Sequence, residues 1–473
     1  MKRLLAPSPD DSASFGLLIR LLGVVHLLAF ASLWVQAAGL WGTDGILPIA
    51  EFLHAAKAQL GTSAYRWLPT VFWLGAGDAA LKAACAAGCV LAGVVIAGLA
   101  PGPALLGLWV LYLSFAAAGR EFMSYQWDIL LLEATFLLML SAPWSLKPDW
   151  RRWAPSRAGV WMTRLLLFRL MFESGIVKLL SHDPTWRSLS ALRYHFETQP
   201  LPTWPAWYAH RLPSPLLTAS CVTMFAIELG APFLIFCGRG ARAFAFWPLL
   251  ALQVLIALTG NYTFFNLLTV VLCCSLLDLK PKTQVNADGK PRRWAVPFFA
   301  VIGLLGVFQL LGLAGVGTPA PVGALARWLS PYDVVNQYGL FAVMTTSRTE
   351  IVLEGSDDGR TWKEYEFKWK PGDVDRRPRF VAPHQPRLDW QMWFAALGPC
   401  RQNEWLVRFM IRLMEAKKPV EGLLSKDPFP DGPAFIRSTA YDYKFTRRGE
   451  KGWWRREGGA PYCPTLASRL KTG

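Results

Sequence analysis

The chain has 473 residues, 53% of them hydrophobic, and its mean hydropathy is positive. Its apolar residues form runs long enough to cross a bilayer, which excludes an ordinary soluble globular protein. The formal net charge is +16, but Lys and Arg accumulate in loops that stay in the cytoplasm, so we interpret the excess as a topology signal and expect no nucleic-acid partner. The composition predicts a polytopic α-helical membrane protein surrounded by membrane lipids.

The apolar runs predict about nine membrane-spanning helices. In chain order they cover residues 15–36, 79–99, 104–118, 128–142, 161–180, 216–237, 244–258, 267–279 and 296–316. The two runs on either side of Asn261 are short for a hydrocarbon layer of about 30 Å, so a re-entrant pair is the alternative there. That alternative does not change the side of the membrane on which each of the other spans begins and ends. The transmembrane domain is predicted over residues 1–320.

Basic residues mark alternate loops of the predicted bundle. They precede the first span or follow the fourth, sixth and eighth, at Lys2, Arg3, Lys147, Arg151, Arg152, Arg157, Arg239, Arg242, Lys280, Lys282, Lys290, Arg292 and Arg293. These loops share one side if the spans alternate, and the positive-inside rule makes that side the cytoplasm. We therefore expect a cytoplasmic N-terminus and an exported C-terminal segment. Ala37-Ala38-Gly39 after the first run also fits a signal-peptide site, although the length of the run favours an uncleaved anchor.

The fifth predicted span, residues 161–180, is the most polar of the nine. The intramembrane polar cluster to which it contributes comprises Asp128, Glu133, Arg164, Arg169, Glu173, Lys178 and Glu228. A charge at bilayer depth costs at least ~2.5 kcal/mol, so these side chains are expected to face protein or water. Arg169 and Glu173 lie one helical turn apart and are expected to pair. Arg164 and Lys178 lie on another side and are expected to pair with carboxylates of neighbouring helices, at Asp128, Glu133 or Glu228.

This polar cluster has two interpretations. Its members either pair internally and fix the packing of the helices, or line a water-filled cavity in which Lys178 acts as a base and Glu173 is a second candidate catalytic residue. The chain carries neither a phosphate-binding glycine loop nor a nucleophile elbow of the kind that marks many soluble enzymes.

Residues 330–473 are predicted to form a separate exported domain that is β-rich and sandwich-like, with appended helices. Residues 348–354 alternate at period two, 355–362 supply turn residues and 363–369 resume the alternation, which predicts a hairpin. Residues 403–417 have the pattern of an amphipathic helix. The aromatic and basic run Trp453-Trp454-Arg455-Arg456 either packs into the core or grips another protein.

Cysteine and histidine usage predicts no metal site. Six cysteines lie in or beside apolar runs, where they behave as small hydrophobic residues: Cys85, Cys89, Cys221, Cys237, Cys273 and Cys274. Cys400 and Cys463 lie in the exported domain, and either a disulfide or two free thiols is compatible with their positions. The six histidines show no metal-ligand spacing, so we expect no structural zinc.

Several long motifs follow one another along the chain. In the membrane region they are Tyr125-Gln-Trp-Asp-Ile-Leu-Leu-Leu-Glu133, Phe172-Glu-Ser-Gly-Ile-Val-Lys-Leu179, residues 186–196 and Gly260-Asn-Tyr-Thr-Phe-Phe-Asn266. In the tail they are residues 330–341, 365–374, 387–396, 427–429 and 441–446. Together these motifs resemble the lipase maturation factor family. The motif residues that we single out are Gln126, Trp127, Gly175, Trp186, Arg187, Asn261, Asn266, Asn336 and Trp390.

This resemblance implies a membrane protein of the endoplasmic reticulum that helps secreted lipases to fold and assemble, with the lumenal domain engaging the client. The short loops and compact tail suggest a bacterial member, for which the inner membrane and the periplasm would take the place of the reticulum and its lumen. From this resemblance we expect no cofactor. It also favours a folding factor over an enzyme.

A second, local resemblance suggests an alternative. Phe172 to Lys178, followed by Trp186, is similar to one helix and loop of the vitamin K-dependent carboxylase group, whose membrane bundle holds a catalytic lysine. This resemblance implies an enzyme that uses Lys178 as a base and acts on a lipid-soluble quinone. A quinone or lipid would then be its cofactor.

Overall fold

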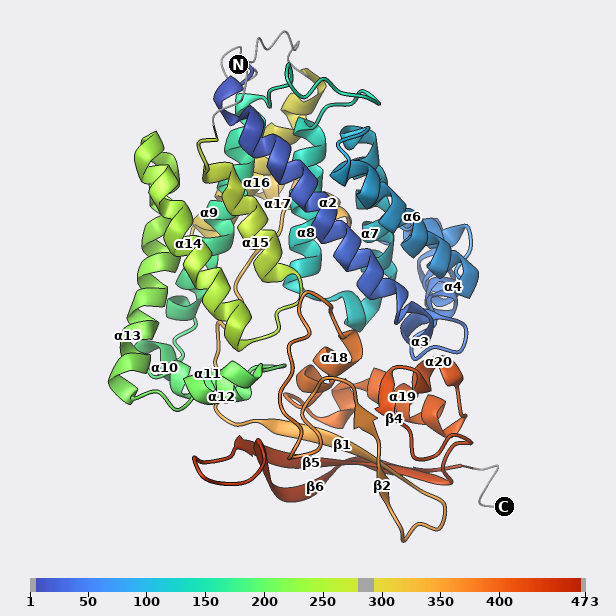
Figure 1. Ribbon diagram of the computed structural model, residues 1–473. Helices are drawn as coiled ribbons and strands as arrows, with labels where there is room; N and C mark the ends of the chain where they lie inside the picture. The colour runs from blue at the N-terminus through green and yellow to red at the C-terminus, as the bar shows by residue number, and fades with distance from the viewer. Residues whose placement is uncertain (1–5, 280–292, 469–473) are drawn as a thin grey trace.

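The computed structural model describes residues 6–279 and 293–468, which form a helical bundle joined to a C-terminal β domain (Figure 1). Each of the nine predicted spans coincides with a helix. These helices are α2 Ser12–Trp34, α6 Asp78–Ile96, α7 Pro101–Ala118, α8 Gln126–Ser141, α9 Arg157–Leu180, α13 Ser214–Phe225, α14 Arg239–Thr259, α15 Phe265–Cys273 and α16 Val296–Leu313. The α13 helix continues through a π-helical turn, Ala226–Gly230, and a 3-10 turn, Ala231–Phe236.

Length, hydropathy and charge together separate the nine helices into two groups. Within the described residues, six helices are long and apolar enough to cross a membrane: Pro9–Trp34, Asp78–Ile96, Pro101–Ala118, Ser214–Phe236, Arg239–Thr259 and Arg293–Leu313. The others are the 16-residue α8, the charged α9 and the short stretch Phe265–Leu276. The 21 residues of α14 extend about 31 Å, which is long enough to span and favours a crossing helix over the re-entrant alternative at this position.

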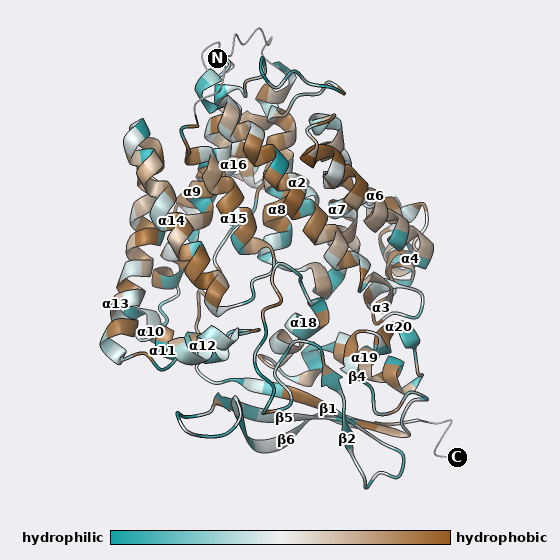
Figure 2. Cartoon of the chain, in the orientation of Figure 1, coloured by the Kyte–Doolittle hydropathy of each residue, from teal (hydrophilic) through white to brown (hydrophobic). Residues whose placement is uncertain are grey.

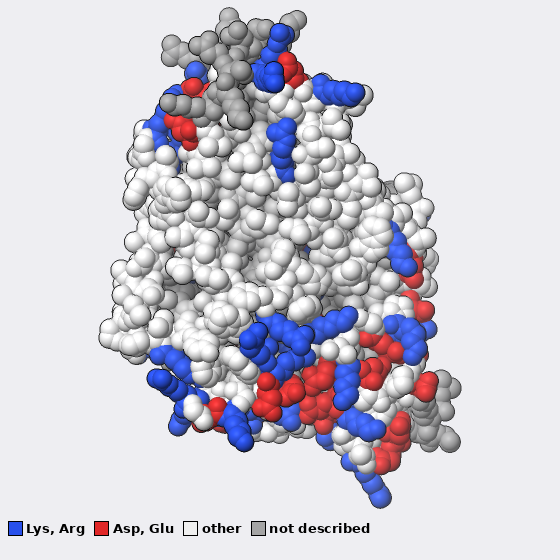
Figure 3. Space-filling model, viewed as in Figure 1, with Lys and Arg blue, Asp and Glu red and all other residues white. Residues whose placement is uncertain are grey.

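The surface of the bundle fits a bilayer. Hydrophobic residues dominate its helices (Figure 2), and on the face in view charged side chains gather at its two ends and on the β domain (Figure 3). The described basic loops lie at the end far from the β domain, where Arg239 pairs with Asp10 and the Arg157 N–H bonds to Ala6 O at 3.0 Å. They therefore share one side, as predicted. The remaining basic loop residues, Lys2, Arg3, Lys280, Lys282, Lys290 and Arg292, lie outside the described residues.

Shorter helices join these elements. Those before the β domain are α3 Ala37–Trp41, α4 Ile49–Leu60, α5 Ala64–Trp67, α10 Pro184–Arg187, α11 Leu192–Thr198, α12 Trp204–Ala209 and α17 Ala320–Leu329. Single 3-10 turns occur at Pro9–Asp11, Gly61–Ser63, Val71–Trp73, Arg120–Met123, Cys274–Leu276, Arg293–Ala295, Ser330–Tyr332 and Cys400–Gln402. After α17 the chain returns along the bundle, so that Val334 and Tyr338 are buried before the first strand begins.

The β domain contains a four-stranded antiparallel sheet in the order β2-β1-β5-β6. Its strands are β1 Thr349–Ser356, β2 Lys363–Glu364, β5 Phe435–Phe445 and β6 Trp454–Ala467. The predicted hairpin is confirmed, because Glu354 pairs with Glu364. The second strand leaves the sheet after two residues, and β3 Glu366–Phe367 pairs instead with β4 Leu424–Lys426.

The layer that covers this sheet is mainly helical, whereas the sequence predicted a sandwich-like arrangement. The helices α18 Arg387–Ala395, α19 Glu404–Met414 and α20 Lys418–Glu421 lie between the sheet and the bundle (Figure 1). The predicted amphipathic helix is confirmed as α19, which buries Trp405, Leu406, Phe409, Met410 and Leu413. This apolar stripe covers the sheet in the way that a second sheet would.

The aromatic run near the C-terminus packs inside the molecule. Trp454 is buried, and its ring stacks on Phe445 with 4.4 Å between the centroids. The ring of Trp453 lies 5.5 Å from that of Trp207 on α12. These contacts support the core-packing interpretation of this run.

Candidate functional site

Arg169 lies at the centre of the intramembrane polar cluster. Its Nη1 donates to Glu133 Oε1 on α8 at 2.8 Å, and its Nε donates to Glu173 Oε1 one turn along α9 at 3.2 Å. None of these three side chains is more than 2% exposed. Its Nη2 donates to Gln309 Oε1 on α16 at 2.5 Å and to the backbone oxygen of Asn336. The predicted pair of Arg169 with Glu173 is confirmed, and Glu133 is a second carboxylate for the same guanidinium.

The segment 333–340 supplies hydrogen-bond donors to the two carboxylates. The backbone N–H of Asn336 donates to Glu133 Oε2 at 2.8 Å, and Tyr338 OH donates to the same oxygen at 2.7 Å. The backbone N–H of Tyr338 donates to Glu173 Oε2 at 2.9 Å. Two carboxylates beside one guanidinium leave an excess negative charge, and hydrogen bonds to a carboxylate favour its charged form. The segment therefore supplies hydrogen bonds to the excess negative charge that the arginine alone does not balance.

Lys178 pairs with Glu228, one of the three partners expected for it. Its Nζ donates to Glu228 Oε2 at 2.7 Å and to Ser174 O at 2.7 Å, and lies 5.5 Å from the centroid of the Trp186 ring. Glu228 sits in the π-helical turn Ala226–Gly230. A Cβ added at Gly175 would lie 2.9 Å from the Cβ of Glu228, so the glycine permits the close approach that brings the two charges together.

Asp128 pairs with an arginine of the β domain. Arg387 on α18 donates from Nη1 to Asp128 Oδ2 and from Nη2 to Asp128 Oδ1, both at 2.9 Å. Tyr112 OH donates to Asp128 Oδ1 at 2.5 Å. Both side chains of the pair are at most 1% exposed, so this bidentate contact joins the domains inside the protein.

The prediction for Arg164 is wrong in its choice of partner. Arg164 donates to Asp11 Oδ1 at 2.5 Å and to Ser275 O at 2.9 and 3.1 Å. It lies 14 residues before Lys178, which is about 21 Å along α9 and places it near the end far from the β domain. The carboxylates expected for it lie at other depths. Asp11 is the N-cap residue of α2 and precedes the predicted first span, residues 15–36, so it was not among the intramembrane partners expected for Arg164.

Two further motif residues, Asn261 and Gln126, lie where the bundle meets the β domain and the 333–340 segment. Asn261 Oδ1 accepts from Val381 N at 2.8 Å and Ala382 N at 3.0 Å, and its Nδ2 donates to Arg379 O at 2.8 Å. Gln126 Oε1 accepts from Gly339 N at 3.0 Å. These side chains satisfy backbone groups, which indicates that they hold the two parts of the chain together.

Two motif tryptophans pack against one another across the same boundary. The ring centroids of Trp127 and Trp390 lie 4.7 Å apart, and Trp127 stacks on Tyr125 at the same distance. In the outer loop after α9, Arg187 bonds to His182 and Trp186 Nε1 donates to Phe341 O at 2.9 Å. The tail motif 387–396 contains both Arg387 and Trp390, and this motif is the sequence signal that could have indicated the interface.

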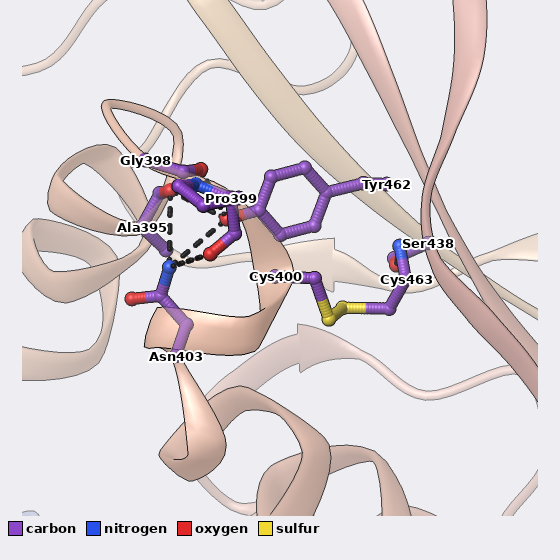
Figure 4. The surroundings of a disulfide bond; sticks show 8 residues. All are labelled: Ala395, Gly398, Pro399, Cys400, Asn403, Ser438, Tyr462 and Cys463. Carbon is purple, nitrogen blue, oxygen red and sulfur yellow. Dashed lines mark hydrogen bonds between the residues drawn. A yellow bond between two sulfur atoms is a disulfide. The ribbon is translucent and has the colours of Figure 1, made fainter.

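Cys400 and Cys463 form a disulfide (Figure 4), which resolves the alternative left open by the sequence. Their Cα atoms are 5.4 Å apart, and the bond ties the turn before α19 to β6. Beside it, Tyr462 OH donates to Ala395 O at 2.6 Å, and Asn403 Nδ2 donates to Pro399 O at 3.1 Å. The bond therefore fixes the helical layer to the edge of the sheet.

Lys178 and Glu228 also line a cavity of about 300 Å³ between α9, α13, α14 and α15. Gln253 and Asn266 line it within the bundle, and His195 lines it from α11. Neither His195 nor Gln253 was among the predicted site residues, because an isolated polar residue carries no spacing signal. Among the described residues, no group of three His, Cys, Asp or Glu is placed to hold a metal ion.

Comparison with known proteins covers both parts of the chain. The family model for the lipase maturation factor transmembrane domain matches residues 15–283, and that for the lipase maturation factor C-terminal domain matches residues 334–464. Lipase maturation factor 2 of Gallus gallus is 36% identical over 94% of this chain and 80% of its own length. The Homo sapiens protein of that name is 35% identical over 94% and 81%. Lipase maturation factor 1 of Bos taurus is 31% identical over 95% and 88%. No solved structure matches the chain.

Proposed function

Because the chain belongs to the lipase maturation factor family, we propose that it is a membrane-anchored factor that assists the folding or assembly of secreted lipases or other exported proteins. The observation that carries this proposal is the similarity to lipase maturation factors across both the bundle and the β domain. The client itself would be an exported protein such as a lipase.

We further propose that the β domain faces the lumen of the endoplasmic reticulum, or the periplasm of a bacterial source, and that the N-terminus is cytoplasmic. The described basic loops share the end of the bundle far from the β domain, which supports this orientation under the positive-inside rule. The disulfide between Cys400 and Cys463 is compatible with an oxidising compartment on the β-domain side.

The contacts between the two domains suggest how such a factor works. The Asp128–Arg387 pair and the bonds of Asn261 to the 379–382 segment hold the β domain against the bundle. A client bound to the β domain would therefore be held at a defined distance from the membrane surface. Rigid attachment also reduces the conformational entropy that binding would otherwise cost.

No observation favours the enzyme alternative. Its candidate base, Lys178, donates hydrogen bonds to Glu228 Oε2 and to the backbone oxygen of Ser174, so it has the geometry of a paired ammonium group and not of a free amine. Its second candidate, Glu173, already accepts from Arg169 and Tyr338.

The test is complementation. Cells that lack their own lipase maturation factors should express the full chain together with a secreted lipase, and lipase activity per mass of secreted lipase should be measured. We expect this specific activity to rise severalfold above that of the empty vector. Protease protection of the β domain in sealed vesicles reports the orientation in the same cells.

Lipase specific activity equal to that of the empty vector, from a chain that is inserted and oriented as proposed, would contradict lipases as clients. Cross-linking of the same chain to other exported proteins would then retain the broader folding role. Loss of both signals would contradict the proposed function.

A further inference from the structure

The cavity beside Lys178 opens toward the lipid. Its walls are mostly apolar and include Leu170, Met224, Leu252, Ile256 and Phe265. Leu255 on α14 and Leu212 just before α13 also line it, and these side chains are 60% and 41% exposed. Because the same residues face both the cavity and the outer surface of the bundle, a molecule in the bilayer can reach the cavity between α13 and α14.

The charges inside this cavity cancel. Lys178 is paired with Glu228 at 2.7 Å. Burial, with a smaller contribution from Lys178, lowers the pKa of His195 on α11 to about 4, so its ring is neutral at pH 7. An additional charged group would lie beside a pair that is already balanced, and a buried unpaired charge is costly. The cavity therefore favours a neutral ligand.

Several polar groups in the cavity have hydrogen-bonding capacity to spare. Among the described residues, Nδ1 of His195 is buried and has no hydrogen-bond partner. The Nε2 of Gln253 donates to the sulfur of Met171 at 3.8 Å, which is a weak contact. The hydroxyls of Ser220 and Thr259 donate to their own helices and keep lone pairs that can accept. A buried polar group without a good partner is unfavourable, so His195 and Gln253 suit a ligand with a hydroxyl or carbonyl.

The backbone around the cavity is also unusual. Glu228 stands in a π-helical turn, a feature that occurs frequently at functional sites. Gly175 on α9 leaves room for this turn, since an added Cβ would lie 2.8 Å from Leu229. The volume of about 300 Å³ is at the lower end of the range for small-molecule sites, roughly 300–1,000 Å³.

We propose that this cavity binds one neutral amphiphile from the bilayer, with its apolar body against α13 and α14 and a hydroxyl or carbonyl head toward His195 and Gln253. The inference is independent of the client, because it concerns the membrane half of the molecule. The Lys178–Glu228 pair forms part of the wall of this site. The proposal does not require a chemical reaction of the ligand.

The test is photolabelling of the full chain in phosphatidylcholine nanodiscs. The probes are a long-chain alcohol that carries a diazirine and the fatty acid and amine of the same chain length. We expect the alcohol to label peptides of α13 and α14 more strongly than either charged probe. Replacing Ser220, which lines the cavity, by Ser220→Phe should reduce this labelling about tenfold by filling the site.

Thr223→Phe is the matched control. Ser220 and Thr223 lie on the same helix, and each hydroxyl donates to the carbonyl four residues earlier, but Thr223 is exposed on the bundle surface. Equal labelling of the two variants, or stronger labelling by the fatty acid or the amine, would overturn the proposal. If Ser220→Phe does not fold, the test is competition on the unmodified chain, in which excess unlabelled alcohol should reduce the labelling. Labelling that the excess alcohol leaves unchanged would also overturn the proposal.

Discussion

Arg387 on α18 and Asp128 on α8 form a bidentate pair with two N···O distances of 2.9 Å, although 259 residues separate them in the sequence. This contact is a fully buried link between the β domain and the bundle, with both side chains at most 1% exposed. Because a desolvated charge is stable only with its partner, the pair couples the stability of the two domains.

Removing one member of this pair should be strongly destabilising. We expect Arg387→Leu to lower the free energy of unfolding by ~3–5 kcal/mol, because Asp128 is left buried without its cation. Thermal unfolding of the purified protein measures the effect. Arg408→Leu, which removes the exposed pair of Arg408 with Glu51, should cost at most about 1 kcal/mol. Combining Arg387→Leu with Asp128→Leu should recover part of the loss; equal Tm values for the single and double variants would contradict this account.

Charge exchange should identify the partner of Lys178. Lys178→Glu places two carboxylates together and should abolish the yield of monodisperse protein, whereas adding Glu228→Lys should restore it. Size-exclusion chromatography of the detergent-solubilised variants gives the yields. The control is Lys178→Glu combined with Glu133→Lys, which should not be restored because Glu133 pairs with Arg169. Equal rescue by both exchanges would refute the pairing.

The glycine at position 175 should not tolerate a methyl group. An added Cβ would meet Leu229 at 2.8 Å and the Cβ of Glu228 at 2.9 Å, so we expect Gly175→Ala to cost about 1–3 kcal/mol. The matched control is Gly312→Ala on α16, where an added Cβ meets no heavy atom within 4 Å. That variant should be neutral or stabilising by up to about 1 kcal/mol, since alanine is the better helix former. Comparable Tm losses in the two variants would count against the close approach.

His384 should make stability depend on pH. Burial, followed by the charges of Arg387 and Lys368, lowers its pKa from 6.5 to about 4. The unfolded chain therefore binds more protons than the folded protein between these values, so the stabilisation present above pH 6.5 is lost as the pH falls toward 4. We expect about 1–2 kcal/mol of this loss between pH 7.5 and pH 5.

The measurement is Tm at pH 7.5 and pH 5 for the unmodified chain and for His384→Asn, which keeps a side-chain partner for Ser32 Oγ. The variant should lose less stability on acidification. The exposed His54→Asn serves as control and should retain the full loss. An unchanged pH dependence in His384→Asn would exclude this histidine as the source.

Thiol counting should verify the disulfide. The chain has eight cysteines, of which six are free, so denaturation without reductant should expose six alkylatable thiols and reduction should expose two more. The bond joins residues 63 positions apart, and its removal by Cys400→Ser with Cys463→Ser should cost about 2–4 kcal/mol. Intact-mass analysis after alkylation distinguishes the two states. Eight reactive thiols before reduction would show that the bond is absent in the purified protein.

The sequence by itself determined the features that reside in a single element. Apolar runs indicated the positions of nine helices among the described residues, six of which are long and apolar enough to cross a membrane, since length and hydropathy are local properties. The i,i+4 spacing was enough to pair Arg169 with Glu173, and a 3.6-residue period was enough to find α19. Alternation and a turn sequence predicted the β1–β2 hairpin for the same reason.

The tertiary structure decided which elements meet. Depth in the bundle paired Arg164 with Asp11, and docking of the β domain paired Asp128 with Arg387; neither distance is encoded in local spacing. The helical layer over the sheet, the donors of segment 333–340 and the cavity beside Lys178 arise in the same way. Each depends on how several elements share one interior, where a buried charge or polar group takes the partner that packing brings within reach.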